Sequence, residues 1–186
     1  MANLKSFASI IILALSVLIA TPLRAGVPTE QIRTTAKKIL DFLNDPQRKS
    51  EAKKEDRRDL LRRTIKPRFN FTEMAKRSLG AHWCRWTPCE RKEFIRLSTD
   101  LLQHTYIGGI THMNDKKFDY LSKNLYENYA VLKTRVAATG GGAFSINYKA
   151  HLVYGDWKVY DIVAETISVV NNYRSQFNRN IRKSFS

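Results

Sequence analysis

Few side chains in this 186-residue sequence have the types and spacing that a catalytic centre requires. The histidines are scattered along the chain, at His82, His104, His112 and His151. No HExxH, GxSxG, GxGxxG or P-loop motif occurs. Asp161 is the one candidate base, because it lies among apolar strand residues. Since no second catalytic group can be named beside it, we favour a structural role, as acceptor for a backbone amide or an arginine. We therefore expect no enzymatic activity and no cofactor.

Both cysteines lie in the segment WCRWTPCE, as Cys84 and Cys89. In an oxidising compartment such a pair can close a local disulfide, and two unpaired thiols are the alternative. The C-x4-C spacing lacks the histidine of a haem-attachment motif, and two cysteines are too few for a structural zinc site. His82 would add only a third ligand, so we expect no bound metal.

The first 25 residues have the layout of a secretory signal peptide. Lys5 precedes an uncharged apolar stretch from Phe7 to Ala20, and the small residue Ala25 ends the segment. The apolar stretch is shorter than the roughly 20 residues that a membrane-spanning helix needs. We expect export, cleavage after Ala25 and a single mature domain over residues 26–186, with an uncleaved anchor as the alternative.

The sequence is strongly basic, with a net charge of +15, of which +13 remains without residues 1–25. Such a surface attracts nucleic acid, anionic lipid headgroups or acidic protein faces. Export argues against nucleic acid. The run from Arg48 to Arg68 holds ten basic and four acidic residues. A solvated helix with i,i+4 ion pairs explains this run, and a docking or membrane-surface patch is the alternative.

The first half of the chain is predicted to be helical. An apolar stripe over residues 32–43 predicts one helix, the basic run predicts a second, and a third ends near Gly80. Thr87, Pro88 and Glu90 form a capping box that opens a fourth helix.

The second half changes to a period of two. Residues 132–138 and 144–152 alternate apolar and polar side chains, with glycine turns at 140–142 and 155. Helices followed by an antiparallel meander indicate an α+β fold, a curved antiparallel sheet covered by helices. The last segment passes from strand to helix near Glu165 without glycine or proline. Periodicity alone favours a packed core over a hollow one.

Three stretches resemble a known family. They are FNFTEMAKRSLGAHWCRWTPCERKEFIRL, DLLQHTY and DWKVYDIVAETISVVNNYRSQF. Together they resemble the Mla C-component family, also called toluene-tolerance auxiliary proteins, over about residues 28–184. The most specific match runs from Trp157 to Phe177. The departures are Cys84 and Cys89, and the segment AETI, which lacks a glycine common after that glutamate in the family.

The resemblance implies a periplasmic carrier of the Gram-negative envelope. Such a protein holds a glycerophospholipid by its acyl chains, in an apolar pocket enclosed by an NTF2-like, cone-like sheet and helices. It moves lipid between an outer-membrane lipoprotein complex and an inner-membrane ABC transporter complex. We expect a monomer with no nucleic-acid partner. The alternatives are a carrier of another lipid, such as a hopanoid, and a basic envelope adaptor that binds only protein.

With this resemblance, inward-facing apolar residues become candidates for lipid contact. We expect the lining to come from Leu97, Leu101, Tyr106, Val136, Ile146, Tyr148, Val159, Val163 and Val169. Arg174 can contact a phosphate, or it can hold the helix that follows Glu165 in place by hydrogen-bonding carbonyls or Asp161. We favour the second role.

Overall fold

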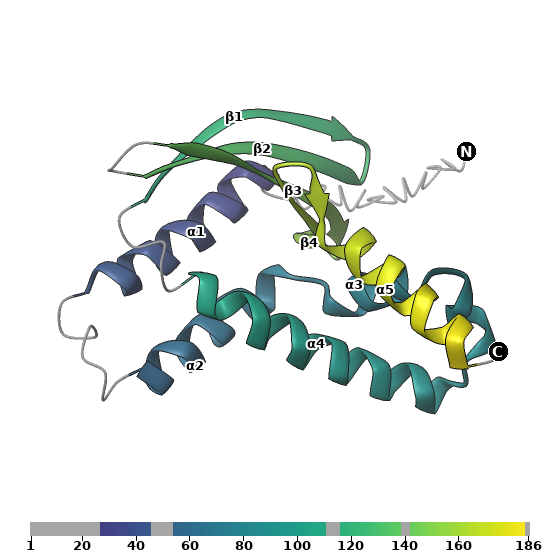
Figure 1. Ribbon diagram of the computed structural model, residues 1–186. Helices are drawn as coiled ribbons and strands as arrows, with labels where there is room; N and C mark the ends of the chain where they lie inside the picture. The colour runs from purple at the N-terminus through teal and green to yellow at the C-terminus, as the bar shows by residue number, and fades with distance from the viewer. Residues whose placement is uncertain (1–26, 46–53, 111–115, 139–141, 185–186) are drawn as a thin grey trace, which may run out of the picture.

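A computed structural model of the chain describes residues 27–45, 54–110, 116–138 and 142–184, so the predicted signal peptide lies outside the described residues. The described part contains a five-stranded antiparallel sheet in the order β1-β2-β3-β4-β5. The strands are β1 Lys116–Tyr126, β2 Tyr129–Ala138, β3 Ala143–Val153, β4 Asp156–Ala164 and β5 Ile167–Ser168. The sheet is curved, and the helices gather on one side of it (Figure 1). The predicted α+β class is confirmed.

The helices of the described part follow the predicted order. They are α1 Pro28–Asn44, α2 Lys54–Ile65, α3 Phe71–Leu79, α4 Pro88–Ile110 and α5 Val169–Ser184, with short 3-10 segments η3 Lys66–Arg68 and η4 Gly80–Arg85. Helix α5 packs against α3, and α1 lies beneath the sheet (Figure 1). Residues 54–68 of the basic run form α2 and η3, and ion pairs such as Arg62–Asp59 (2.6 Å) neutralise part of their charge.

Local sequence signals set the helix ends. The Thr87 amide donates to Glu90 Oε2 (2.7 Å) and the Glu90 amide donates to Thr87 Oγ1 (3.3 Å), which confirms the capping box that opens α4. Helix α3 ends at Gly80, whose φ of 59° places it in the left-handed region that favours glycine. The Arg174 Nε–H donates to the Arg77 carbonyl (2.8 Å) beside this end, so the favoured role of Arg174 is confirmed.

The passage from sheet to helix contains a short strand that the sequence did not predict. The chain turns at Glu165, whose φ is 54°, and β5 then pairs with the end of β4 before α5 begins at Val169. Ser168 Oγ accepts from the Asn171 amide (3.0 Å) as the N-cap of α5. Side-chain capping thus takes the place of the missing glycine or proline.

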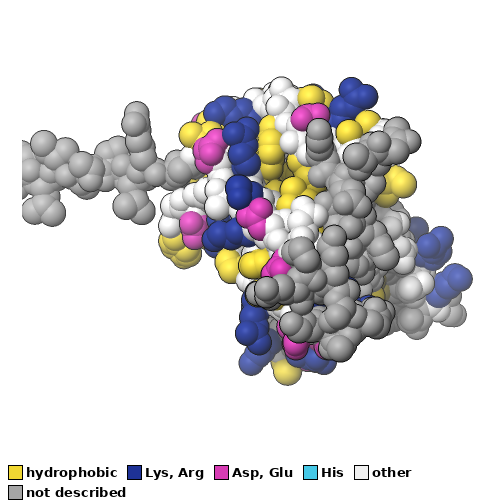
Figure 2. Space-filling view, turned by 90° about the vertical axis from the view of Figure 1, so that its left-hand side faces the viewer, with side chains coloured by type: hydrophobic (Ala, Val, Ile, Leu, Met, Phe, Trp, Pro, Cys, Tyr) yellow, Lys and Arg dark blue, Asp and Glu magenta, His cyan; other side chains and the backbone are white. Residues whose placement is uncertain are grey.

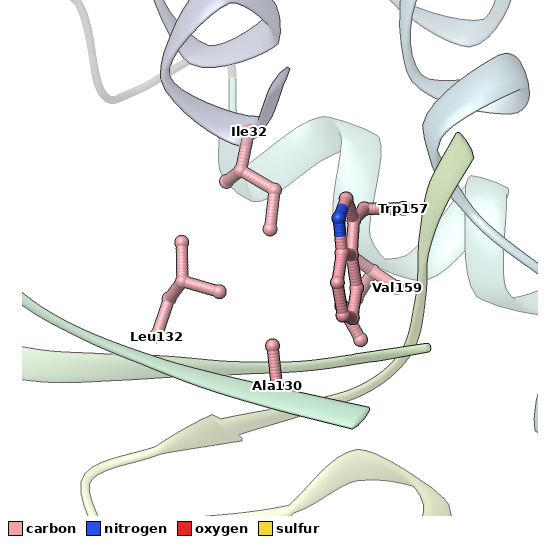
Figure 3. Packing of buried hydrophobic residues seen from close by; sticks show 6 residues of the cluster. Ile32, Ala130, Leu132, Trp157 and Val159 are labelled. Atoms are coloured by element: carbon pink, nitrogen blue, oxygen red, sulfur yellow. The ribbon is translucent and has the colours of Figure 1, made fainter. Parts of the chain in front are cut away.

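A hydrophobic core joins α1 to the sheet. Its buried members are Ile32, Ala130, Leu132, Ala150, Trp157 and Val159. Ile32 points from α1 toward the sheet residues Leu132, Ala130, Trp157 and Val159 (Figure 3). This core fixes the position of α1 over the sheet, and the remaining interior space lies farther along α1.

Candidate functional site

A cavity of about 290 Å³ lies between the sheet and the helices. Helices α1, α3 and α4 supply the wall residues Ile32, Ala36, Ile39, Leu40, Met74, Leu102 and Ile107. The sheet supplies Phe118, Phe144, Ile146, Tyr148, Val159 and Ile162. These side chains are almost all aliphatic or aromatic, so the space suits apolar groups from which water is excluded.

The structure brings together a part of the predicted set of lipid contacts. Tyr106, Ile146, Tyr148, Val159 and Val169 all line the cavity. Leu97, Leu101, Val136 and Val163 do not belong to its lining. The predicted set mixed wall residues with residues of the core and the surface.

Helix orientation separates the two leucines from the cavity. Leu97 and Leu101 are one helical turn apart and are 51% and 44% exposed, whereas Leu102 is buried and lines the wall. Val136 is fully buried in β2 and lies in the packed interior. Apolar character alone did not distinguish these environments.

A shift in strand register accounts for Val163. The pairing of β3 with β4 changes between Lys149 and Ala150, so that Ala150 lies opposite Val159 but Lys149 lies opposite Asp161. Beyond this irregularity Ile162 and Ala164 line the cavity, and Val163 takes the other face. The predicted lining set, which includes both Val159 and Val163, corresponds to uniform alternation along this strand.

The α1 side of the wall was absent from the predicted set. Ile32, Ala36, Ile39 and Leu40 line the cavity, and all belong to the apolar stripe that predicted the helix. That stripe was the signal for them. It was assigned to the core because a helix stripe against a core and one against a cavity have the same spacing.

Asn70 positions the aromatic part of the wall. Its amide N–H donates to the Val159 carbonyl (2.8 Å), and its side-chain Oδ1 accepts from the Glu73 amide (3.0 Å). Phe69 and Phe71, on either side of it, both line the cavity and stack with ring centroids 5.8 Å apart. A single polar residue therefore joins the start of α3 to β4 and fixes two aromatic rings.

His151 supports Asn70 from the sheet. The Asn70 Nδ2 donates to His151 Nε2 (3.0 Å), which requires this nitrogen to be unprotonated. Burial lowers the pKa of His151 below its ordinary 6.5; Glu73 opposes this shift and Arg77 adds to it. The sequence did not predict this polar contact.

We expect the protein to lose stability as the pH falls below about 6.5, where an unfolded histidine takes up a proton that the folded His151 resists. The stabilisation is fully present above that pH and is lost as the pH falls toward the folded pKa. One proton gives at most about 1.4 kcal/mol per pH unit, and the partial exposure of His151 keeps the slope smaller.

Urea unfolding between pH 5 and pH 8 measures this slope. His151→Gln keeps an acceptor for Asn70 without titrating, and its slope should be shallower. His104→Gln, at an exposed position of α4, is the matched control and should behave as wild type. Equal slopes in the His151→Gln variant and the wild-type protein would exclude His151 as the source.

Polar groups at the wall are few. Burial raises the pKa of Tyr148. Burial, together with the neighbouring Tyr173, to which the Tyr106 hydroxyl hydrogen-bonds, raises that of Tyr106, so both phenols are neutral near pH 7. Arg68 is the charged residue of the lining, and burial lowers its pKa. The wall therefore combines a large apolar surface with one cation.

Asp161, the one candidate base, is held by three hydrogen-bond donors. Asp161 is 3% exposed and accepts from the Val170 amide (3.1 Å), the Ser168 hydroxyl (2.8 Å) and Lys149 Nζ (3.1 Å). Its predicted structural role is confirmed. Cys84 and Cys89 are exposed and unpaired, and the described residues hold no cluster of three metal-ligating side chains.

Comparison with known proteins places the chain. The model of the MlaC protein family matches residues 33–186. Among solved structures, the chain is similar to a phospholipid-binding protein from Ralstonia solanacearum in complex with a phospholipid, with a TM-score of 0.75 and 21% identity. That similarity covers 86% of this chain and 89% of the other. No curated protein sequence matches it. None of the helices in the described ranges has the length and apolar character needed to cross a membrane.

The curved sheet, the helices and the apolar wall define a class of α+β proteins with an internal cavity suited to apolar groups. Within that class, this chain belongs to the MlaC family. The resemblance carried by the closing motif, residues 157–177, is thereby confirmed.

Proposed function

We propose that this protein holds a phospholipid by its acyl chains in the cavity and carries it through the periplasm, between an outer-membrane lipoprotein complex and an inner-membrane ABC transporter complex. The observation that carries the proposal is the 290 Å³ cavity with its almost wholly apolar wall. Membership of the MlaC family and the phospholipid named with the Ralstonia protein support it. The chain acts as a monomeric binding protein rather than an enzyme, after removal of residues 1–25.

The energetics of lipid transfer explain the need for such a cavity. Moving one methylene out of water is worth about 0.8 kcal/mol, so two tails with some 30 methylenes face a desorption cost on the order of 20 kcal/mol. Free diffusion of a phospholipid through water is correspondingly slow. A dry cavity with an apolar wall lowers this cost during the crossing.

The basic surface suits a carrier that meets anionic partners. Lysine and arginine side chains spread over the face shown in Figure 2, with hydrophobic side chains between them. The net charge of +13 for residues 26–186 increases the rate of encounter with anionic membranes and acidic protein faces. Long-range attraction of this kind speeds association without fixing the ligand.

The cavity must widen to hold two tails. Its volume lies just below the roughly 300–1,000 Å³ found for small-molecule pockets. Helices α4 and α5 meet through aromatic contacts, the Tyr106–Tyr173 hydrogen bond and the Phe94–Phe177 edge contact with centroids 5.2 Å apart. Of these four residues Tyr106 alone lines the cavity, so separation of Tyr106 from Tyr173 would widen the cavity toward α5.

Extraction of the purified protein with organic solvent, followed by mass spectrometry, tests the proposal. We expect about one phospholipid per chain, with its tails against Tyr106, Ile146, Tyr148, Val159 and Val169. Recovery of a hopanoid would reassign the ligand. A protein that contains no lipid and takes up none from vesicles would contradict the proposal and favour a basic adaptor.

A further inference from the structure

Arg68 departs from the apolar character of the cavity wall. It lines the cavity from η3, where its neighbours Lys66 and Pro67 are exposed, so this part of the wall lies close to the surface. Its Nε–H donates to Thr35 Oγ1 (3.3 Å), and Thr35 also lines the cavity. The guanidinium thus lies at the boundary between the apolar space and the surface.

The hydrogen-bond partners of Arg68 are all neutral. Nη1 donates to the Trp157 carbonyl (2.7 Å) and to Gln31 Oε1. No ion pair within the described ranges involves Arg68, and the nearby Asp156 carboxylate pairs with Lys158 Nζ (3.2 Å). The second amino group, Nη2, has no hydrogen-bond acceptor among the described residues.

A partly buried cation whose hydrogen bonds all go to neutral acceptors is costly for folding, because such acceptors replace hydration only in part. Asp156 attracts Arg68 without a hydrogen bond, and burial still outweighs this attraction in its effect on the pKa of Arg68. Arg68 holds α1 against β4 through its contacts with Gln31, Thr35 and Trp157. They do not explain a charge, since a neutral donor in the same place would serve that purpose. The positive charge at the wall therefore calls for an anionic ligand.

We infer that Arg68 makes the cavity selective for anionic phospholipids, whose phosphate accepts a charge-assisted hydrogen bond from Nη2 while the acyl chains occupy the apolar space. This inference rests on the proposed function. A zwitterionic lipid such as phosphatidylethanolamine carries an ammonium group beside its phosphate, and this ammonium is repelled by Arg68. Phosphatidylglycerol has the phosphate alone and keeps the full attraction.

Loading from vesicles of equal phosphatidylglycerol and phosphatidylethanolamine tests the inference. Protein stripped of lipid is incubated with the vesicles and re-isolated, and the lipid bound is measured as a total amount and as a ratio. We expect wild type to favour phosphatidylglycerol about five- to tenfold, with the preference declining as salt rises. Arg68→Gln should lose the preference, so that the lipid it binds has the vesicle ratio.

Two further variants separate charge from shape. Arg68→Lys keeps the charge and should keep a preference of several-fold. Arg63→Gln removes the same charge from an exposed position of α2 and should match wild type. An Arg68→Lys ratio equal to that of Arg68→Gln would overturn the inference. So would a wild-type ratio equal to that of the vesicles, a result that does not depend on how any variant folds.

The total and the ratio report on different claims. Absence of bound lipid in wild type would contradict the proposed function itself, whereas normal total binding without preference would contradict only the role of Arg68. Inorganic phosphate alone provides the remaining comparison. The inference of lipid selectivity would be wrong if phosphate raised the melting temperature of wild type as much as phosphatidylglycerol does and left that of Arg68→Gln unchanged. The site would then bind a free anion.

Discussion

Bound phospholipid is expected to fall at least about tenfold in the Ala36→Phe variant, equivalent to a loss of about 1.4 kcal/mol in binding free energy. Ala36 lies on the cavity-facing stripe of α1 and contributes only a methyl group to the wall. A cavity of about 150 Å³ is enough to hold benzene, so one phenyl ring takes up about half of the 290 Å³. The added ring therefore occupies space that an acyl chain needs.

The effect on folding should be small, which distinguishes blocking from unfolding. Adding a large side chain to a filled core costs about 1–3 kcal/mol, but a ring that enters an existing cavity gains contacts instead. Urea unfolding should thus give a free energy equal to or above that of wild type. Ala81→Phe, at an exposed position of η4 outside the lining, is the matched control and should retain its lipid.

Lipid content after extraction is the deciding measurement. If Ala36→Phe carried as much phospholipid as wild type while folding normally, the acyl chains would have to lie elsewhere. Lipid loss together with a large drop in stability would show that the cavity is not open space. Either result would count against the cavity as the binding site.

Local signals in the sequence carried most of the fold. The capping box at Thr87 and the stop at Gly80 depend on neighbours within a few residues, and both were confirmed. The alternation in β3 likewise predicted that Ile146 and Ala150 face inward, where both are buried. Features that depend on contacts between residues close in the chain can be predicted from residue type and spacing.

The wall of the site was harder to predict because it depends on features without a local signature. The register shift at Lys149 and Ala150 reverses the parity of β4, and no glycine or proline marks it. The β5 pairing likewise rests on a tertiary contact between β4 and the segment that leads into α5. A cavity and a core are lined by the same residue types, so sequence periodicity could not distinguish the hollow interior from a filled one.

Asp161 gives the largest expected effect on stability. The same irregularity in register places its carboxylate where it joins three elements: it accepts from Lys149 of β3, from Ser168 of β5 and from the Val170 amide of α5. Asp161→Ala removes all three acceptor contacts and leaves the buried Val170 amide without that partner. At about 1 kcal/mol for each contact, we expect a loss of about 3 kcal/mol in the free energy of unfolding.

Asp161→Asn tests the charge at nearly constant shape. The amide keeps one oxygen and turns the other acceptor position into a donor, which faces the donors on Ser168 and Lys149. We therefore expect a loss close to that of the alanine variant. Asp156→Asn, in the same strand, is the control: its carboxylate is 58% exposed and pairs with Lys158, so its loss should stay below about 1 kcal/mol.

The Asp161 variants also separate a structural carboxylate from a catalytic one. A structural role predicts that the unfolding free energy falls in both variants and that α5, which begins next to Asp161 and lines the cavity through Val169, loses protection from hydrogen exchange first. If Asp161→Asn were as stable as Asp156→Asn, the carboxylate would not be needed at the start of α5. A buried carboxylate that does not stabilise the fold would favour a catalytic role for Asp161.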